Sequence, residues 1–248
     1  MGVEKTFFDH PEPPVGTQPA LTRAETRAVD RIAVEELAIP SLVLMENAGR
    51  NAAAEIARLA ARAGAARVCV FCGTGGNGGD GFVVIRHLAN RGLAIRAFLV
   101  GQPERLASDC AANCRIVEAM GIGVSKITLE RQAAELAGTL GAGDLVVDAL
   151  LGSGFSGRVR SPVDRVIQAI NDADAALVVA IDVPSGLDCD TGAAGHVAVR
   201  ADRTLTFVAS KVGFSARQAK PYVGRVKVLD IGAPPQLVNR ILLERSAG

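Results

Sequence analysis

The chain has 248 residues, of which 49 % are hydrophobic and 21 % are charged, as in globular proteins with a substantial core. Its 27 Lys and Arg nearly balance its 26 Asp and Glu, so charge gives no support for a nucleic-acid or membrane-surface partner. It has no Trp and one Tyr, too few aromatic side chains for base stacking, and no apolar run long enough to span a membrane. We therefore expect a globular protein that binds neither nucleic acid nor membranes.

The first 20 residues contain four prolines and mixed charges, and they lack the apolar stretch of a signal peptide. They predict a flexible N-terminal extension, and a cytoplasmic location is expected by default. A single domain over residues 21–248 is the simplest organisation, because the rest of the chain has no internal repeat and no convincing linker.

Two helices are predicted at the start of this domain. Thr22 and Glu25 have the spacing of a capping box, and the helix that they begin ends before Pro40. The second helix runs from Ser41 to Ala63, where a glycine closes it. It is apolar over most of its circumference, more than one sheet face needs, which predicts a homodimer formed through the leading helices.

Beyond the second helix, short apolar runs alternate with helical patterns. Strands are predicted at residues 68–71, 95–100, 144–147, 177–181, 205–208 and 226–229. Helices are predicted at residues 82–90, 104–120 and 162–170, with a further candidate at 131–140. This alternation indicates βαβ units and an α/β domain with a mostly parallel sheet.

The five cysteines are expected to be reduced thiols. Cys69 and Cys72 have the CxxC spacing of a redox or metal motif, but the apolar run around them favours a buried strand. Cys110 and Cys114 lie four apart in a helical pattern without nearby partner ligands.

Three predicted strands are followed by glycine-rich segments that carry oxygen-bearing side chains. They are Gly73-Thr-Gly-Gly-Asn-Gly-Gly-Asp-Gly, Asp148-Ala-Leu-Leu-Gly-Ser-Gly and Asp182-Val-Pro-Ser-Gly-Leu-Asp. Parallel strands place all three at the same edge of the sheet, where α/β proteins bind ligands. Helix capping is the alternative role for Asp148 and Asp182.

The first of these segments is not a Walker loop, because it lacks the Gly-Lys-Ser/Thr sequence. It fits a dinucleotide fingerprint poorly, because Asp80 would place a carboxylate where a pyrophosphate binds and no acidic residue ends the strand at 95–100. An NAD-dependent oxidoreductase is therefore disfavoured. Asn77, Asp148 and Ser185 offer only oxygen ligands, a set that suits a hard cation; one carboxylate among three favours a monovalent ion.

Four motifs in order resemble the YjeF N-terminal family over about residues 21–235. The motifs are Met45-Glu-Asn-Ala-Gly-Arg, the glycine-rich segment from Gly73, Val147-Asp-Ala-Leu-Leu-Gly-Ser-Gly and Ile181-Asp-Val-Pro-Ser-Gly-Leu-Asp. The resemblance implies a Rossmann-like three-layer αβα sandwich, commonly dimeric, and NAD(P)H-hydrate epimerase activity on the R and S epimers of hydrated NADH or NADPH. It implies functional coupling to a separate ADP- or ATP-dependent dehydratase, whose domain in bifunctional members we expect this chain to lack.

The resemblance also assigns site residues. It implies a potassium ion held by Asn77, Asp148 and Ser185. It implies substrate contacts from Gly76, Asn77, Gly78, Gly79 and Asp80, from Gly152, Ser153, Gly154, Phe155, Ser156, Gly157 and Arg158, and from Asp182. The family usually has two adjacent asparagines, whereas here the first position is Gly76, so one substrate hydrogen bond is in doubt.

Asp182 is our hypothesis for the acid/base that protonates and regenerates the substrate hydroxyl. Lys211, which follows the strand at 205–208, is a weaker candidate for the same crevice. His87 and His196 are interpreted as structural or solvated. Glu46 and Asn47 either line the pocket or serve a subunit contact. The rival function is a non-catalytic nucleotide- or protein-binding scaffold of the same fold, which predicts eroded loops.

Overall fold

The computed structural model describes residues 19–136 and 138–247. Its main sheet has seven strands, all parallel, in the order β4-β3-β2-β5-β6-β7-β9. The strands are β2 (Arg67–Cys72), β3 (Ile95–Val100), β4 (Val124–Ile127), β5 (Asp144–Ala149), β6 (Leu177–Ile181), β7 (Arg203–Phe207) and β9 (Arg225–Leu229). From β2 the chain builds the sheet outward through β3 to β4, and then returns to the other side of β2 with β5. The topological switch point therefore lies between β2 and β5.

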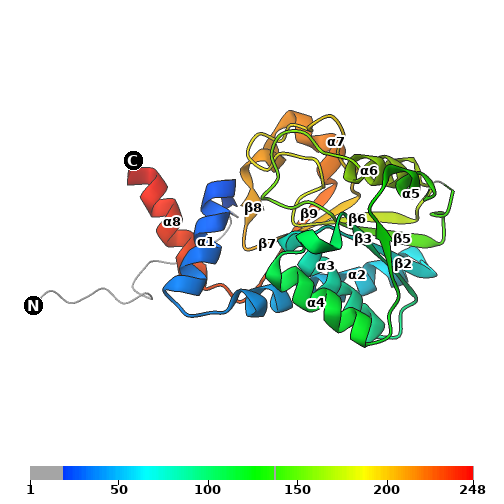
Figure 1. The fold of residues 1–248 in the computed structure, drawn as a ribbon. Coiled ribbons are helices and arrows are strands. Elements are labelled where there is room, and N and C mark those ends of the chain that lie inside the picture. The colour runs from blue at the N-terminus through cyan, green and yellow to red at the C-terminus, as the bar shows by residue number, and fades with distance from the viewer. Residues whose placement is uncertain (1–18, 137, 248) are drawn as a thin grey trace, which may run out of the picture.

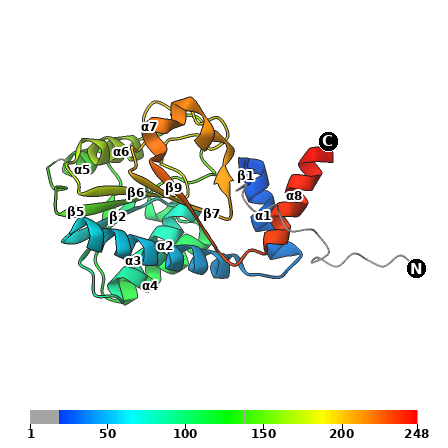
Figure 2. The ribbon, with the colours of Figure 1, turned by 180° about the vertical axis from the view of Figure 1, so that it is seen from behind.

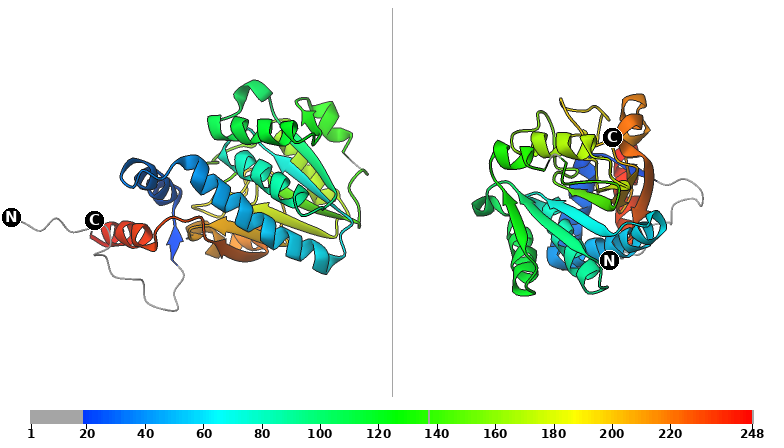
Figure 3. Two further views of the ribbon diagram at one scale, coloured as in Figure 1. Left: turned by 90° about the horizontal axis from the view of Figure 1, so that it is seen from below. Right: turned by 90° about the vertical axis from the view of Figure 1, so that its right-hand side faces the viewer.

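Helices cover both faces of the sheet (Figure 1). The helices α2 (Ser41–Ala63), α3 (Gly76–Ala89) and α4 (Ser108–Ala119) lie on one face, and α5 (Glu130–Ala134) and α6 (Val163–Asp172) lie on the other. Alternate residues of β2 divide between the two layers: Val68 and Val70 pack with the first set, Cys69 and Phe71 with the second. Figure 3 shows the three layers from two further directions. The predicted αβα sandwich is confirmed.

Two helices from opposite ends of the chain lie side by side beyond the edge of these layers (Figure 2). They are α1 (Arg23–Glu35), which begins with the predicted capping box of Thr22 and Glu25, and α8 (Pro235–Ala247). Just before α1, the short strand β1 (Ala20–Leu21) pairs in parallel with β8 (Ser210–Lys211). Residues 1–18 of the predicted N-terminal extension lie outside the described residues.

The helix after the first glycine-rich segment begins earlier than predicted, at Gly76 rather than at residue 82. Gly78 and Gly79 are needed for packing rather than for a loop. A Cβ atom on Gly78 would lie 1.9 Å from the Gly73 carbonyl oxygen, and one on Gly79 would lie 2.6 Å from the Met45 side chain. Composition alone therefore indicated a loop where close packing forms a helical turn.

Other boundaries also differ from prediction. The predicted helix at 104–120 divides into a 3-10 turn, η1 (Pro103–Arg105), and α4, and the candidate at 131–140 is the shorter α5. Strand β4 was not predicted, because this edge strand exposes its central Ser and Lys. The prediction also omitted α8 and the short elements η2 (Val212–Ser215), η3 (Arg217–Ala219) and α7 (Lys220–Val223).

All five cysteines are buried free thiols, and the CxxC pair lies within β2, which confirms the structural interpretation of that spacing. Within residues 19–136 and 138–247, no helix combines the length and the apolar character needed to cross a bilayer.

Candidate functional site

A cavity of about 1000 Å³ opens at the carboxyl edge of the sheet, over the switch point between β2 and β5. Its walls come from α1, from the start of α2, from the segment that links β2 to α3, and from the segments that follow β5 and β6. The three glycine-rich segments singled out in the sequence therefore meet at one site, as the parallel-strand argument predicts.

Most of the residues that the resemblance assigns to the substrate line this cavity. Those that do are Gly76, Asn77, Asp80, Gly152, Ser153, Gly154, Phe155, Ser156, Arg158 and Asp182. Gly78 and Gly79 instead pack against neighbouring segments, and Gly157 adopts a left-handed backbone outside the cavity wall. At Gly76 a Cβ atom would meet nothing within 4 Å, so the asparagine usual in the family would fit there without a clash.

Asp182 follows β6 with a left-handed backbone (φ 62°), a conformation that non-glycine residues rarely adopt. Its side chain is held at both oxygens. The Ser153 amide donates to Oδ2 at 2.7 Å, and the Lys211 ammonium lies 3.2 Å from Oδ1. Burial acts to raise the pKa of Asp182, but the Lys211 charge and the Ser153 hydrogen bond outweigh it, so the pKa lies below its ordinary value. The cavity wall therefore carries a firmly ionised carboxylate.

Lys211 lies behind Asp182 rather than in the cavity. Its side chain is only 1 % exposed, and its ammonium donates to the Thr206 hydroxyl and to the carbonyl oxygens of Phe207 and Ala209 as well as facing Asp182. Lys211 is not among the residues that line the cavity, so its role is to support Asp182 and not to face a ligand.

Asp148 occupies the corresponding place one strand away, inside β5, and is completely buried. Its carboxylate accepts hydrogen bonds from the Ser185 amide at 2.8 Å, from the Ser185 hydroxyl at 2.5 Å and from the Leu150 amide at 3.2 Å. Burial raises the pKa of Asp148 to about 6, against the lowering effect of these donors. All three of these donors are neutral.

Asn77 lies in the first turn of α3 with its amide aimed at the segment after β5. Its Nδ2 donates to the Leu151 carbonyl oxygen at 3.0 Å, whereas its Oδ1 is buried without a hydrogen-bond partner. The Leu151 amide in turn donates to the Ser185 hydroxyl, which also binds Asp148. Buried acceptors are rarely left unpaired. The unpaired Oδ1, on a side chain linked through Leu151 and Ser185 to Asp148, fits the oxygen ligands that a monovalent cation requires.

Within the described residues, no group of three or more His, Cys, Asp and Glu side chains could hold a metal ion. The set of Asn77, Asp148 and Ser185 is of a different kind, since two of its members are neutral oxygen ligands.

Two further carboxyl groups face the same cavity. Burial and the charges of Asp182 and Asp30 raise the pKa of Asp80 well above its ordinary value. Asp30, where α1 lines the cavity, has a pKa raised to about 6 by burial and by Asp182, with Lys211 acting in the opposite direction. Within one wall, the pKa of Asp182 is lowered and that of Asp80 is raised.

The sequence analysis missed the contribution of α1 to the site. Thr26, Arg27, Asp30 and Val34 line the cavity, yet their spacing is that of an ordinary amphipathic helix. Tertiary contacts of α1 with distant segments, which local patterns do not encode, bring them there.

The remaining candidates do not face the cavity. Glu46 forms an ion pair with Arg86 and lies 2.8 Å from His87 Nε2, which holds α2 against α3. Asn47 donates to the Ile231 carbonyl oxygen at 3.0 Å, and His196 lies 3.8 Å from a carboxylate oxygen of Asp164. These contacts support the structural interpretation of both histidines and give Asn47 a role within the subunit.

The fold and the site define a class: a doubly wound α/β protein with a carboxyl-lined small-molecule cavity at its switch point. A family model described as "YjeF-related protein N-terminus" matches residues 41–213. The chain is 40 % identical to an NAD(P)H-hydrate epimerase of Rhodopirellula baltica, over 96 % of this chain and 95 % of that protein. The chain belongs to this YjeF-related family.

Other relatives extend the comparison. A bifunctional NAD(P)H-hydrate repair enzyme Nnr of Moorella thermoacetica is 41 % identical over 90 % of this chain, which spans 43 % of that longer protein. The crystal structure of yeast ynu0, YNL200c, has a TM-score of 0.72 with 21 % identity, over 90 % of this chain and 93 % of that one. At that identity the structural likeness supports the fold alone.

Proposed function

We propose that this protein is an NAD(P)H-hydrate epimerase, which interconverts the R and S epimers of hydrated NADH and NADPH. The family membership and the epimerase relatives of nearly equal length support the activity. The observation that carries the proposal to specific residues is the ionised Asp182 on the wall of a cavity large enough for a dinucleotide. An eroded scaffold would have no reason to keep that buried charge pair.

The reaction needs the carbon–oxygen bond at ring carbon 6 to break and re-form. The neighbouring ring nitrogen supplies an electron pair, the hydroxyl leaves as water once it is protonated, and a flat iminium ion remains. Water then adds to either face and gives up a proton. Asp182, as a carboxylate, stabilises the iminium charge and accepts the proton of the attacking water.

A carboxylate with a lowered pKa is a poor proton donor, so the leaving hydroxyl needs a second group. Asp80 supplies it, because Asp80 lines the same cavity and burial together with the charges of Asp182 and Asp30 raises its pKa well above the ordinary value, which favours the protonated form. Two carboxyl groups with separated pKa values divide the acid and base roles between them. No net proton is consumed, since the donor recovers from solvent the proton that the base releases.

A potassium ion is part of the proposal, held by Asn77, Asp148 and Ser185. The unpaired Asn77 Oδ1 and the lack of an internal cation beside Asp148 support this assignment. When bound, the ion would supply positive charge beside the segments that bind the dinucleotide.

The proposal also includes a homodimer formed through the leading helices, a cytoplasmic location and a separate ADP- or ATP-dependent dehydratase that consumes one epimer. Exposed apolar side chains support the dimer: Leu42 and Val43 on α2 are 43 % and 46 % exposed. A dimer in light scattering at micromolar concentration is the expected result, and a monomer contradicts it.

The activity is tested with a mixture of the two hydrated NADH epimers and a dehydratase specific for one of them. With this protein added, the dehydratase should convert the whole mixture to NADH, and without it the slow phase should proceed only at the spontaneous rate. An unchanged slow phase contradicts the epimerase and favours the scaffold. Reduction of a dinucleotide in the absence of hydrate would indicate an oxidoreductase.

A further inference from the structure

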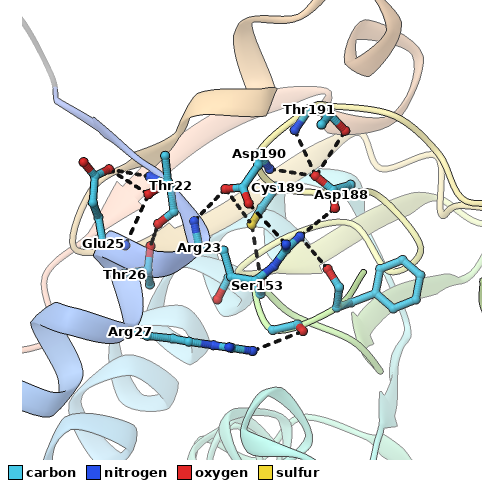
Figure 4. Close-up of polar contacts among 12 residues, drawn as sticks. Thr22, Arg23, Glu25, Thr26, Arg27, Ser153, Asp188, Cys189, Asp190 and Thr191 are labelled. Atoms are coloured by element: carbon cyan, nitrogen blue, oxygen red, sulfur yellow. Dashed lines mark hydrogen bonds and ion pairs between the residues drawn. The ribbon is translucent and has the colours of Figure 1, made fainter. Parts of the chain in front are cut away.

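Arg23, the first residue of α1, joins that helix to two segments distant in the sequence (Figure 4). Its Nε donates to the Ser153 carbonyl oxygen at 2.9 Å, and its Nη2 donates to the Phe155 carbonyl oxygen at 2.8 Å. The same guanidinium pairs with Asp188 at 2.6 Å and with Asp190 at 3.1 Å. All three guanidinium nitrogens of Arg23 are therefore engaged.

The two acidic partners are themselves fixed. Asp188 accepts the amides of Asp190 and Thr191 and the Thr191 hydroxyl, and Asp190 accepts the backbone amide of Arg23 at 2.6 Å. The segment at 188–191 is thus a preformed anionic cradle for the guanidinium. A lysine ammonium in its place could not reach the two carbonyl oxygens and both carboxylates together, because it lacks the planar fork of arginine.

Ser153 connects this cradle to the candidate site. Arg23 holds the Ser153 carbonyl from one side, while the Ser153 amide donates to Asp182 Oδ2 at 2.7 Å on the other. The only other donor to that carbonyl among the described contacts is the Cys189 thiol, at 3.4 Å, a weak donor. The orientation of the Ser153–Gly154 peptide therefore depends mainly on Arg23, and the Ser153 Cα joins it to the Gly152–Ser153 peptide, whose N–H contacts Asp182.

The residues just before Arg23 reach the other side of Asp182. Leu21 in β1 pairs with Lys211 in β8, and the Lys211 ammonium faces Asp182 Oδ1. The short stretch from Ala20 to Arg23 thus contacts the partners of both carboxylate oxygens, although it lies about 160 residues away in sequence from Asp182.

We propose that Arg23 is a positioning residue for the reaction, which fixes the Ser153 amide against Asp182 and so sets the orientation of that carboxylate in the cavity. Its role rests on the proposed epimerase function. The alternative is that Arg23 merely docks α1 on the body of the protein. The two roles differ in what they change: docking affects stability, whereas positioning affects turnover in protein that remains folded.

The test compares Arg23→Met and Arg23→Lys with wild type and with Arg31→Met, which removes an exposed ion pair to Glu35 on the same helix. In the coupled assay, kcat of Arg23→Met should fall by up to about 100-fold with a smaller change in KM, since a displaced catalytic group costs turnover first. Arg31→Met should keep the wild-type kcat. Arg23→Lys, which keeps the charge balance of the cradle, should regain stability but only part of kcat.

Hydrogen exchange gives a readout that does not depend on activity. The amides of residues 151–156 should exchange faster in Arg23→Met, and those of α3 should not; Arg31→Met should leave both unchanged. If the wild-type protein has no epimerase activity, the proposed function is overturned. The exchange result then decides only whether Arg23 orders residues 151–156. Unchanged exchange of the amides of residues 151–156 in Arg23→Met overturns the proposal for Arg23. A wild-type kcat in Arg23→Lys overturns it as well, and this second outcome remains decisive if Arg23→Met fails to fold.

Discussion

Asp148 and Asp182 lie at the ends of neighbouring strands, β5 and β6, and both are buried, yet their surroundings differ in one respect. Asp182 has an internal cation, Lys211, while the donors to Asp148 are all neutral. The pKa of Asp182 consequently lies below its ordinary value and that of Asp148 rises to about 6. Asp182, whose charge is balanced by Lys211, is available for chemistry. Asp148, whose donors are all neutral, is suited to binding an external cation.

The largest expected effect is the loss of turnover in Asp182→Asn. Asn tolerates the left-handed backbone of this position and keeps the shape, but it cannot take up a proton, so the rate should fall on the order of 10²–10⁴, down to the spontaneous floor. The coupled assay measures it, with Asp174→Asn on the exposed surface as the control.

Because Asp182→Asn also leaves the Lys211 charge unpaired, its stability should fall as well. The double variant Asp182→Asn/Lys211→Met removes both charges and should recover stability without recovering turnover. Recovery of turnover in that double variant would mean that Asp182 is structural.

Lys211→Met alone should destabilise the protein by about 3 kcal/mol or more, because it leaves a buried carboxylate without its counter-charge. Chemical denaturation measures the free energy of unfolding. Lys227→Met, which removes a half-exposed pair with Glu55, is the matched control and should cost less than about 1 kcal/mol. Equal losses in the two variants would contradict the claim that the Asp182–Lys211 pair differs from a surface pair.

The two aspartates should affect stability with opposite dependence on pH. The lowered pKa of Asp182 contributes stability above its unfolded value, near 3.8, and this contribution is lost as the pH falls through the folded pKa. The raised pKa of Asp148 means that the fold favours its protonated form, so stability decreases as the pH rises from about 4 to about 6, by at most about 3 kcal/mol.

Denaturation of wild type and Asp148→Asn between pH 4 and 7 in potassium-free buffer should show this decrease in wild type alone. Potassium should suppress the decrease in wild type, because an ion beside Asp148 stabilises its charged form. A decrease of equal size in both proteins would assign it to other groups.

The smallest expected effect is that of Asn77→Ala without potassium. The variant loses one hydrogen bond, from Nδ2 to Leu151, worth about 1 kcal/mol. Asn51→Ala, which removes a similar bond to the Asp230 carbonyl oxygen at the surface, should cost about as much or less. Added potassium should raise the melting temperature of wild type and Asn51→Ala but not of Asn77→Ala. An equal rise in all three would place the ion elsewhere.

The sequence was sufficient for the architecture, because strands such as Leu177–Ile181 are apolar runs long enough to be buried on both faces. It also predicted that three glycine-rich segments meet at one edge of the sheet. Through the resemblance, it identified the family that the comparisons confirm. Periodicity failed in the first turns of α3, where Gly78, Gly79 and Gly81 disfavour a helix by propensity but are required by close packing.

The partners of the site residues could not be predicted. Lys211 follows an ordinary strand, and nothing local marks it as the counter-charge of Asp182. Arg23 resembles any first-turn cation of an amphipathic helix, and its contacts to residues 153, 155, 188 and 190 join it to segments more than 100 residues away in the sequence. Such pairings depend on tertiary packing, which single-sequence patterns do not contain.

Helix α1 forms one wall of the cavity while it packs beside α8 beyond the edge of the sheet (Figure 2). Occupancy of the cavity and attachment of this helix are therefore thermodynamically linked. A molecule that binds only when α1 is in place stabilises the attached form by RT ln(1 + [L]/Kd), and detachment of α1 opens the wall through which that molecule escapes. Saturating ligand should accordingly slow protease cleavage between α1 and α2, at residues 36–40, more than it slows cleavage at the opposite end of the sheet.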